Sequence, residues 1–265
     1  YEYSYGYQNW YESAKYETIN TRKNVGLFDL SAFAKFEIKG NSALRDLQLL
    51  CCNDIKNDPG KTTYTQMLNS NGGIVADLTV TCINEKFFRI ITGSSVKDHN
   101  KKHIIENLSE DTTLTDITDD LACLGIFGPK SRELLKNLFG EHFSTNDFMF
   151  GTAKEIKFND SNIIFQRLSF VGELGWEIYI PINISRDIYL KLVEYGKKYG
   201  LVHAGGHALD IMRMEKGYLH WGHDISPAEN PYEAGLEFTV KLDKKIDFIG
   251  KESLKTKNRK KKKQL

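Results

Sequence analysis

The sequence contains few cysteines and few prolines. Four cysteines and five prolines occur among 265 residues, and no two cysteines have the C-x-x-C spacing of a zinc or redox site. Two cysteines are adjacent, at Cys51 and Cys52, which is a poor start for a disulfide framework. This cysteine usage is typical of a reducing, cytosol-like compartment.

A long apolar run and an excess of one charge are also missing. No stretch of about 18 apolar residues occurs, so we expect no transmembrane helix, and no signal peptide is recognisable. The 36 basic and 35 acidic residues give a net charge of +1, which gives no electrostatic reason to expect a nucleic-acid partner. The exception is the basic run at residues 257–263, which fits a solvated tail or a nucleic-acid arm.

Nucleotide and metal motifs are absent as well. The sequence has no phosphate loop, no nucleophile elbow and no G-x-G-x-x-G motif. His203 and His207 have the spacing of two metal ligands on one helix, but Gly205 and Gly206 lie between them and the expected carboxylate ligand is missing. We therefore expect neither a metal site nor a dinucleotide site.

The apolar periodicity predicts helices and antiparallel hairpins without a strict strand–helix–strand rhythm. This pattern favours an α+β fold over a doubly wound parallel sheet. The expected helices cover residues 8–25, 43–50, 96–108, 131–138, 185–199 and 208–215, with Asn41 and Ser185 as helix caps. The expected strands cover residues 27–31, 33–38, 87–91, 112–117, 123–127, 163–168 and 176–181, besides one hairpin near Asn71.

That hairpin is the most informative segment. Residues 67–80 (MLNSNGGIVADLTV) contain two apolar runs joined by Asn71-Gly72-Gly73, which supplies the positive φ angles of a two-residue turn. Asp77 lies within the second run, between Ala76 and Leu78. A carboxylate inside a buried strand must be paired, hydrogen-bonded or used. Asp77 is therefore the first candidate for a catalytic residue.

Two further charged residues interrupt apolar segments. Glu177 alternates with Trp176 and Ile178, and it fits either a solvated outer face or a carboxylate that accepts two adjacent N–H donors of a ligand. Arg213 lies in a mostly apolar helix, and it fits either an ion pair with Asp210 or a fork for an anionic ligand. The residues alone leave these alternatives open.

Three segments together resemble one family. They are residues 67–80, 172–181 (GELGWEIYIP) and 213–225 (RMEKGYLHWGHDI). The chain resembles the folate-binding aminomethyltransferases typified by the glycine cleavage T protein, and within them the C-terminal folate domain of dimethylglycine and sarcosine dehydrogenases. The resemblance runs from about Trp10 to Leu265 and implies two mixed α/β subdomains.

The resemblance implies roles for six residues. Asp77 matches the family's catalytic aspartate, and Glu177 matches the glutamate that holds the pterin amino and ring N–H groups. Arg213 matches an arginine on the folate-binding wall. The other implied folate contacts are the aromatic residues Phe170, Phe148 and Phe238. Phe170 stands where the family has a tyrosine, so it lacks the hydroxyl contact.

The implied cofactor is tetrahydrofolate, and the implied product is methylenetetrahydrofolate, formed from the methyl-derived carbon of sarcosine or dimethylglycine. A flat pterin suits aromatic walls, and a partly buried carboxylate such as Asp77 can stabilise a cationic one-carbon group. The implied partners are folate and a small methylated amine, with neither nucleic acid nor a membrane. The implied compartment is the bacterial cytoplasm or, in a eukaryote, the mitochondrial matrix.

The resemblance also implies a domain organisation. Residues 1–240 would form the folate-binding region, with an inserted subdomain at about 41–118, and residues 241–265 would form a linker and the start of a truncated C-terminal β-barrel. FAD would belong only to a missing N-terminal flavin domain, so the chain is expected to be a fragment that partners with both missing parts. The alternatives are a free aminomethyltransferase or related folate-dependent demethylase, and a non-catalytic folate-binding or structural domain.

Overall fold

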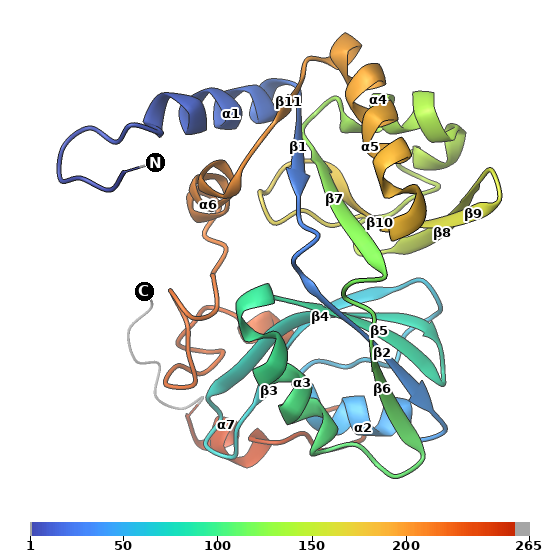
Figure 1. Ribbon diagram of the computed structural model, residues 1–265. Helices are drawn as coiled ribbons and strands as arrows, with labels where there is room; N and C mark the ends of the chain where they lie inside the picture. The colour runs from blue at the N-terminus through green and yellow to red at the C-terminus, as the bar shows by residue number, and fades with distance from the viewer. Residues whose placement is uncertain (1, 258–265) are drawn as a thin grey trace. The chain divides into compact units, whose positions relative to one another are not determined.

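The chain folds as two compact units in the computed structural model, which describes residues 2–257 (Figure 1). Unit 1 contains the chain up to Ser31 and Asp119–Tyr218, and unit 2 contains Ala32–Thr118 and the chain from Leu219 onward. Each unit combines helices with one sheet, which confirms the expected α+β class with two mixed subdomains. The basic run beyond Lys257 lies outside the described residues, as does the end of the segment expected to begin a barrel.

Unit 1 is built on a six-stranded sheet with the strand order β11-β1-β7-β10-β9-β8. The β1–β11 pair is parallel, and the other neighbouring strands are antiparallel. The strands are β1 (Val25–Asp29), β7 (Leu121–Phe127), β8 (Ala153–Phe158), β9 (Ser161–Gln166), β10 (Gly175–Pro181) and β11 (Leu201–His203).

The helices of unit 1 determine which face of this sheet is buried in its core. The described helices are α1 (Tyr11–Lys23), α4 (Ser131–Phe139), α5 (Ile182–Gly196) and α6 (Gly206–Glu215), with the 3₁₀ turns η2 (Glu141–Phe143) and η3 (Lys197–Tyr199). Helices α4 and α5 lie side by side over the sheet face that carries Trp176 and Ile178 (Figure 1). Because side chains alternate along a strand, Glu177 and Tyr179 point to the opposite face.

Unit 2 is built on a five-stranded antiparallel sheet with the strand order β3-β4-β5-β2-β6. The strands are β2 (Ala34–Gly40), β3 (Thr62–Leu68), β4 (Ile74–Asn84), β5 (Phe87–Thr92) and β6 (Thr112–Asp116). The described helices are α2 (Ala43–Leu50), α3 (Lys97–Ile105) and α7 (Lys251–Lys257), with the 3₁₀ turns η1 (Ser94–Val96) and η4 (Glu237–Thr239). Leu47 of α2 and Ile104 of α3 pack with Ala76 and Leu78. Asp77 therefore points away from these two helices.

Both predicted helix caps are wrong. Helix α2 has Ser42 at its N-cap position, so Asn41 lies one residue outside the helix. Helix α5 begins three residues before Ser185, directly after Pro181, and the Ser185 hydroxyl instead donates to the Ile182 carbonyl oxygen at 2.8 Å. At α5 the prediction fails because β10 ends at Pro181 and the helix begins at the next residue. No loop separates the two, so no loop residue is available to cap the helix.

The predicted hairpin is present, but its turn is longer than two residues. Within the connection from Asn69 to Gly73, Gly72 alone has a positive φ angle, of 81°. The Asn69 side-chain oxygen accepts hydrogen bonds from the backbone N–H groups of Asn71 (3.0 Å) and Gly73 (2.9 Å). The arrangement corresponds to a three-residue hairpin loop that ends on a left-handed glycine.

A β-bulge compensates for this longer turn. The register of the two strands shifts between Met67 and Leu68, so that beyond the bulge Gln66 pairs with Asp77. A two-residue turn at Asn71-Gly72 would give the same pairing. The bulge thus places a buried amide directly beside the candidate carboxylate.

We predict that Asn69→Ala destabilises the protein, because two backbone N–H groups of the turn lose their acceptor. The free energy of unfolding should fall by about 1–2 kcal/mol in urea denaturation. Ser70→Ala, at the neighbouring exposed position of the same turn, is the matched control and should change stability by less than about 0.5 kcal/mol. Equal losses in the two variants would contradict the role of Asn69.

Candidate functional site

Asp77 lies in unit 2 among neutral hydrogen-bond partners. Its Oδ1 accepts a hydrogen bond from Gln66 Nε2 at 2.8 Å. Burial raises the pKa of Asp77 to about 6, and hydrogen bonding by Gln66 and Tyr64 opposes that rise. All the groups that shift this pKa are uncharged. Asp77 is therefore a carboxyl group that can gain or release a proton close to neutral pH.

An aromatic pair in unit 2 includes Tyr64, a hydrogen-bond partner of Asp77. The ring centroids of Tyr64 on β3 and Phe238 in η4 are 6.3 Å apart, and Phe238 is 63% exposed. Burial, followed by the charge of Asp77, raises the pKa of Tyr64 well above its usual value, so its hydroxyl stays protonated. Tyr64 thus neighbours both the Asp77 carboxyl group and the exposed ring of Phe238.

Glu177 is buried in unit 1, with 6% of its surface exposed. The alternative of a solvated outer face is therefore wrong. Its Oε2 accepts a hydrogen bond from the Tyr179 hydroxyl at 2.6 Å. Burial raises the pKa of Glu177, and the Tyr179 hydrogen bond opposes that rise. A carboxylate has more acceptor positions than one hydroxyl fills, so Glu177 can accept further N–H donors.

Arg213 is also buried in unit 1, with 5% of its surface exposed. Its Nε and Nη2 both lie 2.7 Å from Asp210 Oδ1, which confirms the ion pair, and Nη1 donates to the Tyr218 carbonyl oxygen at 3.0 Å. The Tyr218 ring stacks on Phe170, with the centroids 6.3 Å apart. Arg213 and Phe170 therefore meet at Tyr218, while Glu177 is held separately by Tyr179.

Phe148 occupies a different environment from the other five predicted residues. It is fully buried in the core of unit 1, stacked on Phe143 at 5.7 Å and edge-on to Trp176 at 5.9 Å. This packing accounts for the ring without any ligand. A folate contact by Phe148 stays a prediction.

The histidines that share metal-ligand spacing have separate partners. His207 stacks on Trp10 at 3.9 Å, whereas His203 Nε2 lies 2.9 Å from the Tyr189 hydroxyl. Within residues 2–257, no group of three or more His, Cys, Asp or Glu side chains could hold a metal ion. No helix in this range is long and apolar enough to span a bilayer.

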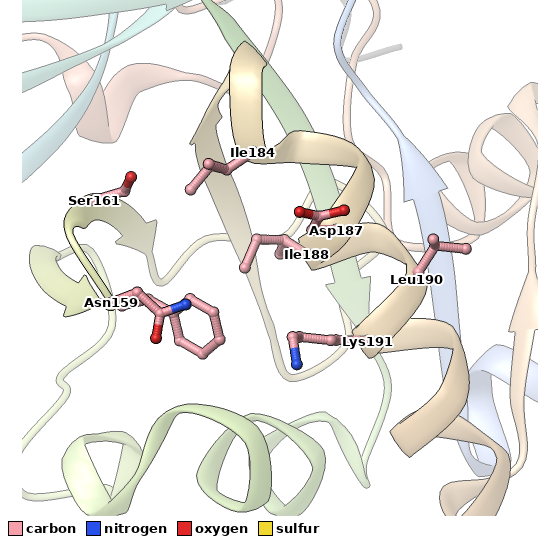
Figure 2. A pocket seen from close by; sticks show the side chains of 8 residues that line it. Asn159, Ser161, Ile184, Asp187, Ile188, Leu190 and Lys191 are labelled. Carbon is pink, nitrogen blue, oxygen red and sulfur yellow. The ribbon is translucent and has the colours of Figure 1, made fainter.

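A pocket of about 310 Å³ lies in unit 1 between the β8–β9 hairpin and α5 (Figure 2). Asp187 and Lys191 project toward it from α5, and Asn159 comes from the hairpin turn. The pocket contains none of the six predicted site residues. It has an apolar wall and two exposed charges, which is an ordinary surface groove, and we assign it no role in the candidate site.

Sequence reasoning did not identify the residues that hold the two carboxyl groups. These are Tyr64, Gln66 and Tyr179. A signal for Gln66 and Tyr64 was available, because the register of the predicted hairpin places Gln66 opposite Asp77 and Tyr64 on the same face. The alternation of β10 likewise places Tyr179 on the same face as Glu177.

Comparison with known proteins assigns the chain to a family. The family described as "GCVT N-terminal domain" matches residues 1–244. The chain belongs to this family. A solved structure, the glycine cleavage system aminomethyltransferase T from Bartonella henselae, shares the fold with a TM-score of 0.84 and 23% sequence identity, over 94% of this chain and 67% of that chain.

Curated relatives of this GCVT-family chain include both short and long proteins. It is 33% identical to an aminomethyltransferase of Halothermothrix orenii, over 92% of this chain and 68% of that protein. It is 39% identical to 4-methylaminobutanoate oxidase (formaldehyde-forming) of Paenarthrobacter nicotinovorans and 35% identical to mitochondrial sarcosine dehydrogenase of Homo sapiens, in both cases over 96% of this chain. The chain spans 31% and 29% of the length of these two proteins.

The raised pKa of Asp77 predicts how stability changes with pH. In the unfolded chain this carboxyl group loses its proton near pH 4, whereas in the folded chain it does so near pH 6. The folded state therefore binds more protons between these values, and stability is lost as the pH rises through this window. In Asp77→Asn the side chain does not titrate, so this pH-dependent loss of stability is absent.

Relative to the wild type, Asp77→Asn should gain about 2 kcal/mol in free energy of unfolding between pH 4 and pH 7.5, measured by urea denaturation at both values. Asp243→Asn, at an exposed position of the same unit, serves as the control and should show no such gain. A constant difference between wild type and Asp77→Asn at both pH values would mean that Asp77 titrates like an ordinary aspartate.

Proposed function

We propose that the chain is the tetrahydrofolate-dependent one-carbon transfer module of a flavin dehydrogenase that oxidises sarcosine or dimethylglycine. The observation that carries this proposal is the presence of two carboxyl groups, the half-buried Asp77 and the buried Glu177, which accept hydrogen bonds from neutral side chains. Neither needs such costly burial for structural reasons alone, because an apolar residue would serve better in a sheet. Buried carboxyl groups of this kind are typical of functional sites.

The residues of unit 1 fit the pterin part of tetrahydrofolate. The edge of a pterin carries adjacent N–H donors, and Glu177 has unfilled acceptor positions for them. The half-buried Phe170 and the neighbouring Tyr218 ring supply an aromatic surface for a flat heterocycle. Arg213 Nη1 donates a hydrogen bond to the Tyr218 backbone carbonyl oxygen, and this bond would keep the Tyr218 ring in place.

The residues of unit 2 fit the reacting part of the site. Tetrahydrofolate, when bound, supplies the nitrogen acceptor of the one-carbon unit. Asp77 would stabilise positive charge that develops beside it, since a carboxylate in a low-dielectric setting interacts more strongly than one in water. With a pKa of about 6 it can also hold or release a proton near neutral pH. Phe238 and Tyr64 would shield this charge from solvent on one side.

The relatives support more than one donor of the one-carbon unit. The names of the longer relatives refer to sarcosine and to 4-methylaminobutanoate, which are both N-methylated amino acids. The aminomethyltransferase of H. orenii is covered over 68% of its length, which favours a free aminomethyltransferase as the second candidate. The two candidates share the folate site and differ in the donor.

The proposed role of Glu177 predicts a loss of folate affinity in Glu177→Gln, which keeps the shape of the side chain and removes its charge. The dissociation constant of tetrahydrofolate, measured by isothermal titration calorimetry under anaerobic conditions, should rise roughly 10- to 100-fold, because a charge-assisted hydrogen bond is lost. Glu155→Gln, at an exposed position on β8 of the same sheet, should bind like the wild type. Unchanged affinity in Glu177→Gln would remove Glu177 from the site.

The proposed role of Asp77 concerns transfer more than binding. In the full protein supplied with sarcosine or dimethylglycine, Asp77→Asn should keep a dissociation constant within about threefold of the wild type and lower methylenetetrahydrofolate formation about 100-fold. The methyl-derived carbon should then appear as free formaldehyde. Wild-type yields of methylenetetrahydrofolate in this variant would exclude Asp77 from the transfer step.

A further inference from the structure

Gln66 connects Asp77 to a second group of buried polar side chains in unit 2. The side chains of Gln66 and Thr239 are fully buried. On one side, Gln66 Nε2 donates to Asp77 Oδ1 at 2.8 Å. On the other side, Gln66 Oε1 lies 2.5 Å from Thr239 Oγ1 and 3.7 Å from Cys52 Sγ. The result is a relay of hydrogen bonds from η4, through Gln66 on β3, to Asp77 on β4.

Two side chains that can donate to Oε1 bear on which end of the Gln66 amide faces Asp77. The Thr239 hydroxyl, which lies 2.5 Å from Oε1 and 2.7 Å from the Leu236 carbonyl oxygen, can donate its one proton to either acceptor. The Cys52 thiol can also donate to Oε1, because burial raises the pKa of Cys52 and keeps its proton in place. An amide turned end for end would place Oε1 against the Asp77 carboxylate, with two acceptors facing each other. The ionised Asp77 carboxylate therefore selects the Nε2 end of the amide, and donation from Thr239 or Cys52 to Oε1 supports this orientation.

This fixed orientation affects the two protonation states of Asp77 differently. Either oxygen of an ionised carboxylate can accept the hydrogen bond from Nε2. A neutral carboxyl group carries an O–H donor, and Nε2 offers no acceptor for it. The other group that shifts the pKa of Asp77 among the described residues is the protonated Tyr64 hydroxyl on β3, which is also uncharged. Thr92 of β5 donates to the Asp77 backbone oxygen at 3.1 Å rather than to the carboxyl group. Gln66 therefore favours the ionised form of Asp77 against the effect of burial.

We propose that Gln66, oriented by Thr239 and Cys52, is a positioning residue that keeps Asp77 ionised and fixed in direction. The use of this carboxylate in one-carbon transfer rests on the proposed function, whereas the relay itself does not. Gln66 touches no reacting atom in this scheme and acts entirely through Asp77.

The test is a pH titration of Asp77 in the folded protein, followed by NMR of side-chain ¹³C-carboxyl-labelled aspartate. The Asp77 signal is assigned by its loss in Asp77→Asn. The wild-type midpoint should lie near pH 6. Gln66→Met should raise the midpoint by about 1 pH unit, because the carboxylate loses a hydrogen bond to its charged form. Thr239→Val should raise it by a smaller amount.

A variant with both substitutions shows whether Thr239 acts on Asp77 through Gln66 or independently of it. If Thr239 acts through Gln66, Gln66→Met with Thr239→Val should titrate like Gln66→Met alone. Additive shifts, or an unmoved midpoint in Gln66→Met, would overturn the proposal. Thr81→Val, which removes a buried hydroxyl that pairs with Thr62 at 2.9 Å on the same two strands, is the control and should leave the midpoint unchanged.

Two further readouts keep the result interpretable. If Gln66→Met does not fold, Thr239→Val combined with Cys52→Ala removes both donors at Oε1 and should still raise the midpoint, and an unmoved midpoint there overturns the relay. Calorimetry with tetrahydrofolate on the same wild-type sample tests the proposed function separately. Absence of folate binding would reject that function and leave the titration result intact.

Discussion

The half-buried Asp77 and the buried Glu177 each have only neutral partners among the described residues, and this is the constraint on which the rest of the structure depends. Among residues 2–257, the groups that shift the pKa values of Asp77 and Glu177 are neutral side chains. Such burial costs free energy, and hydrogen bonds from amide and hydroxyl groups offset part of this cost. In each unit, the apolar residues packed on the other face of the sheet supply the stability that offsets this cost.

This constraint explains how the two units are built around their sheets. In each unit a pair of helices covers the sheet face that carries the apolar side chains, and the carboxyl group points to the other face. In unit 2 the polar partner Gln66 of Asp77 comes from the neighbouring strand, and Gln66 in turn is bonded by Thr239 of η4, far away in the sequence. The two candidate carboxyl groups are thus positioned by sheet register rather than by loops, which gives each a well-defined direction.

Much of this arrangement could be predicted from the sequence, and the reasons for the failures are physical. The unusual charge of Asp77 within an apolar run indicated a special residue, and the turn residues indicated a hairpin whose register is the observed one. The turn itself was predicted too short, because the β-bulge that compensates for the extra residue leaves no trace in the apolar pattern. The alternation around Glu177 showed which face it occupies, but could not show that this face is covered, because covering segments come from distant parts of the chain. The same limit applies to Phe148, whose aromatic neighbours are set by tertiary packing.

Hydrogen–deuterium exchange of the backbone amides, with and without tetrahydrofolate, tests the central claim most directly. The claim is that Asp77 and Glu177, each on the sheet of its own unit, are groups that respond to tetrahydrofolate. We expect tetrahydrofolate to slow exchange in β4 around Asp77 and in β10 around Glu177. Protection confined to one of these strands, or no protection at saturating tetrahydrofolate, would contradict the account.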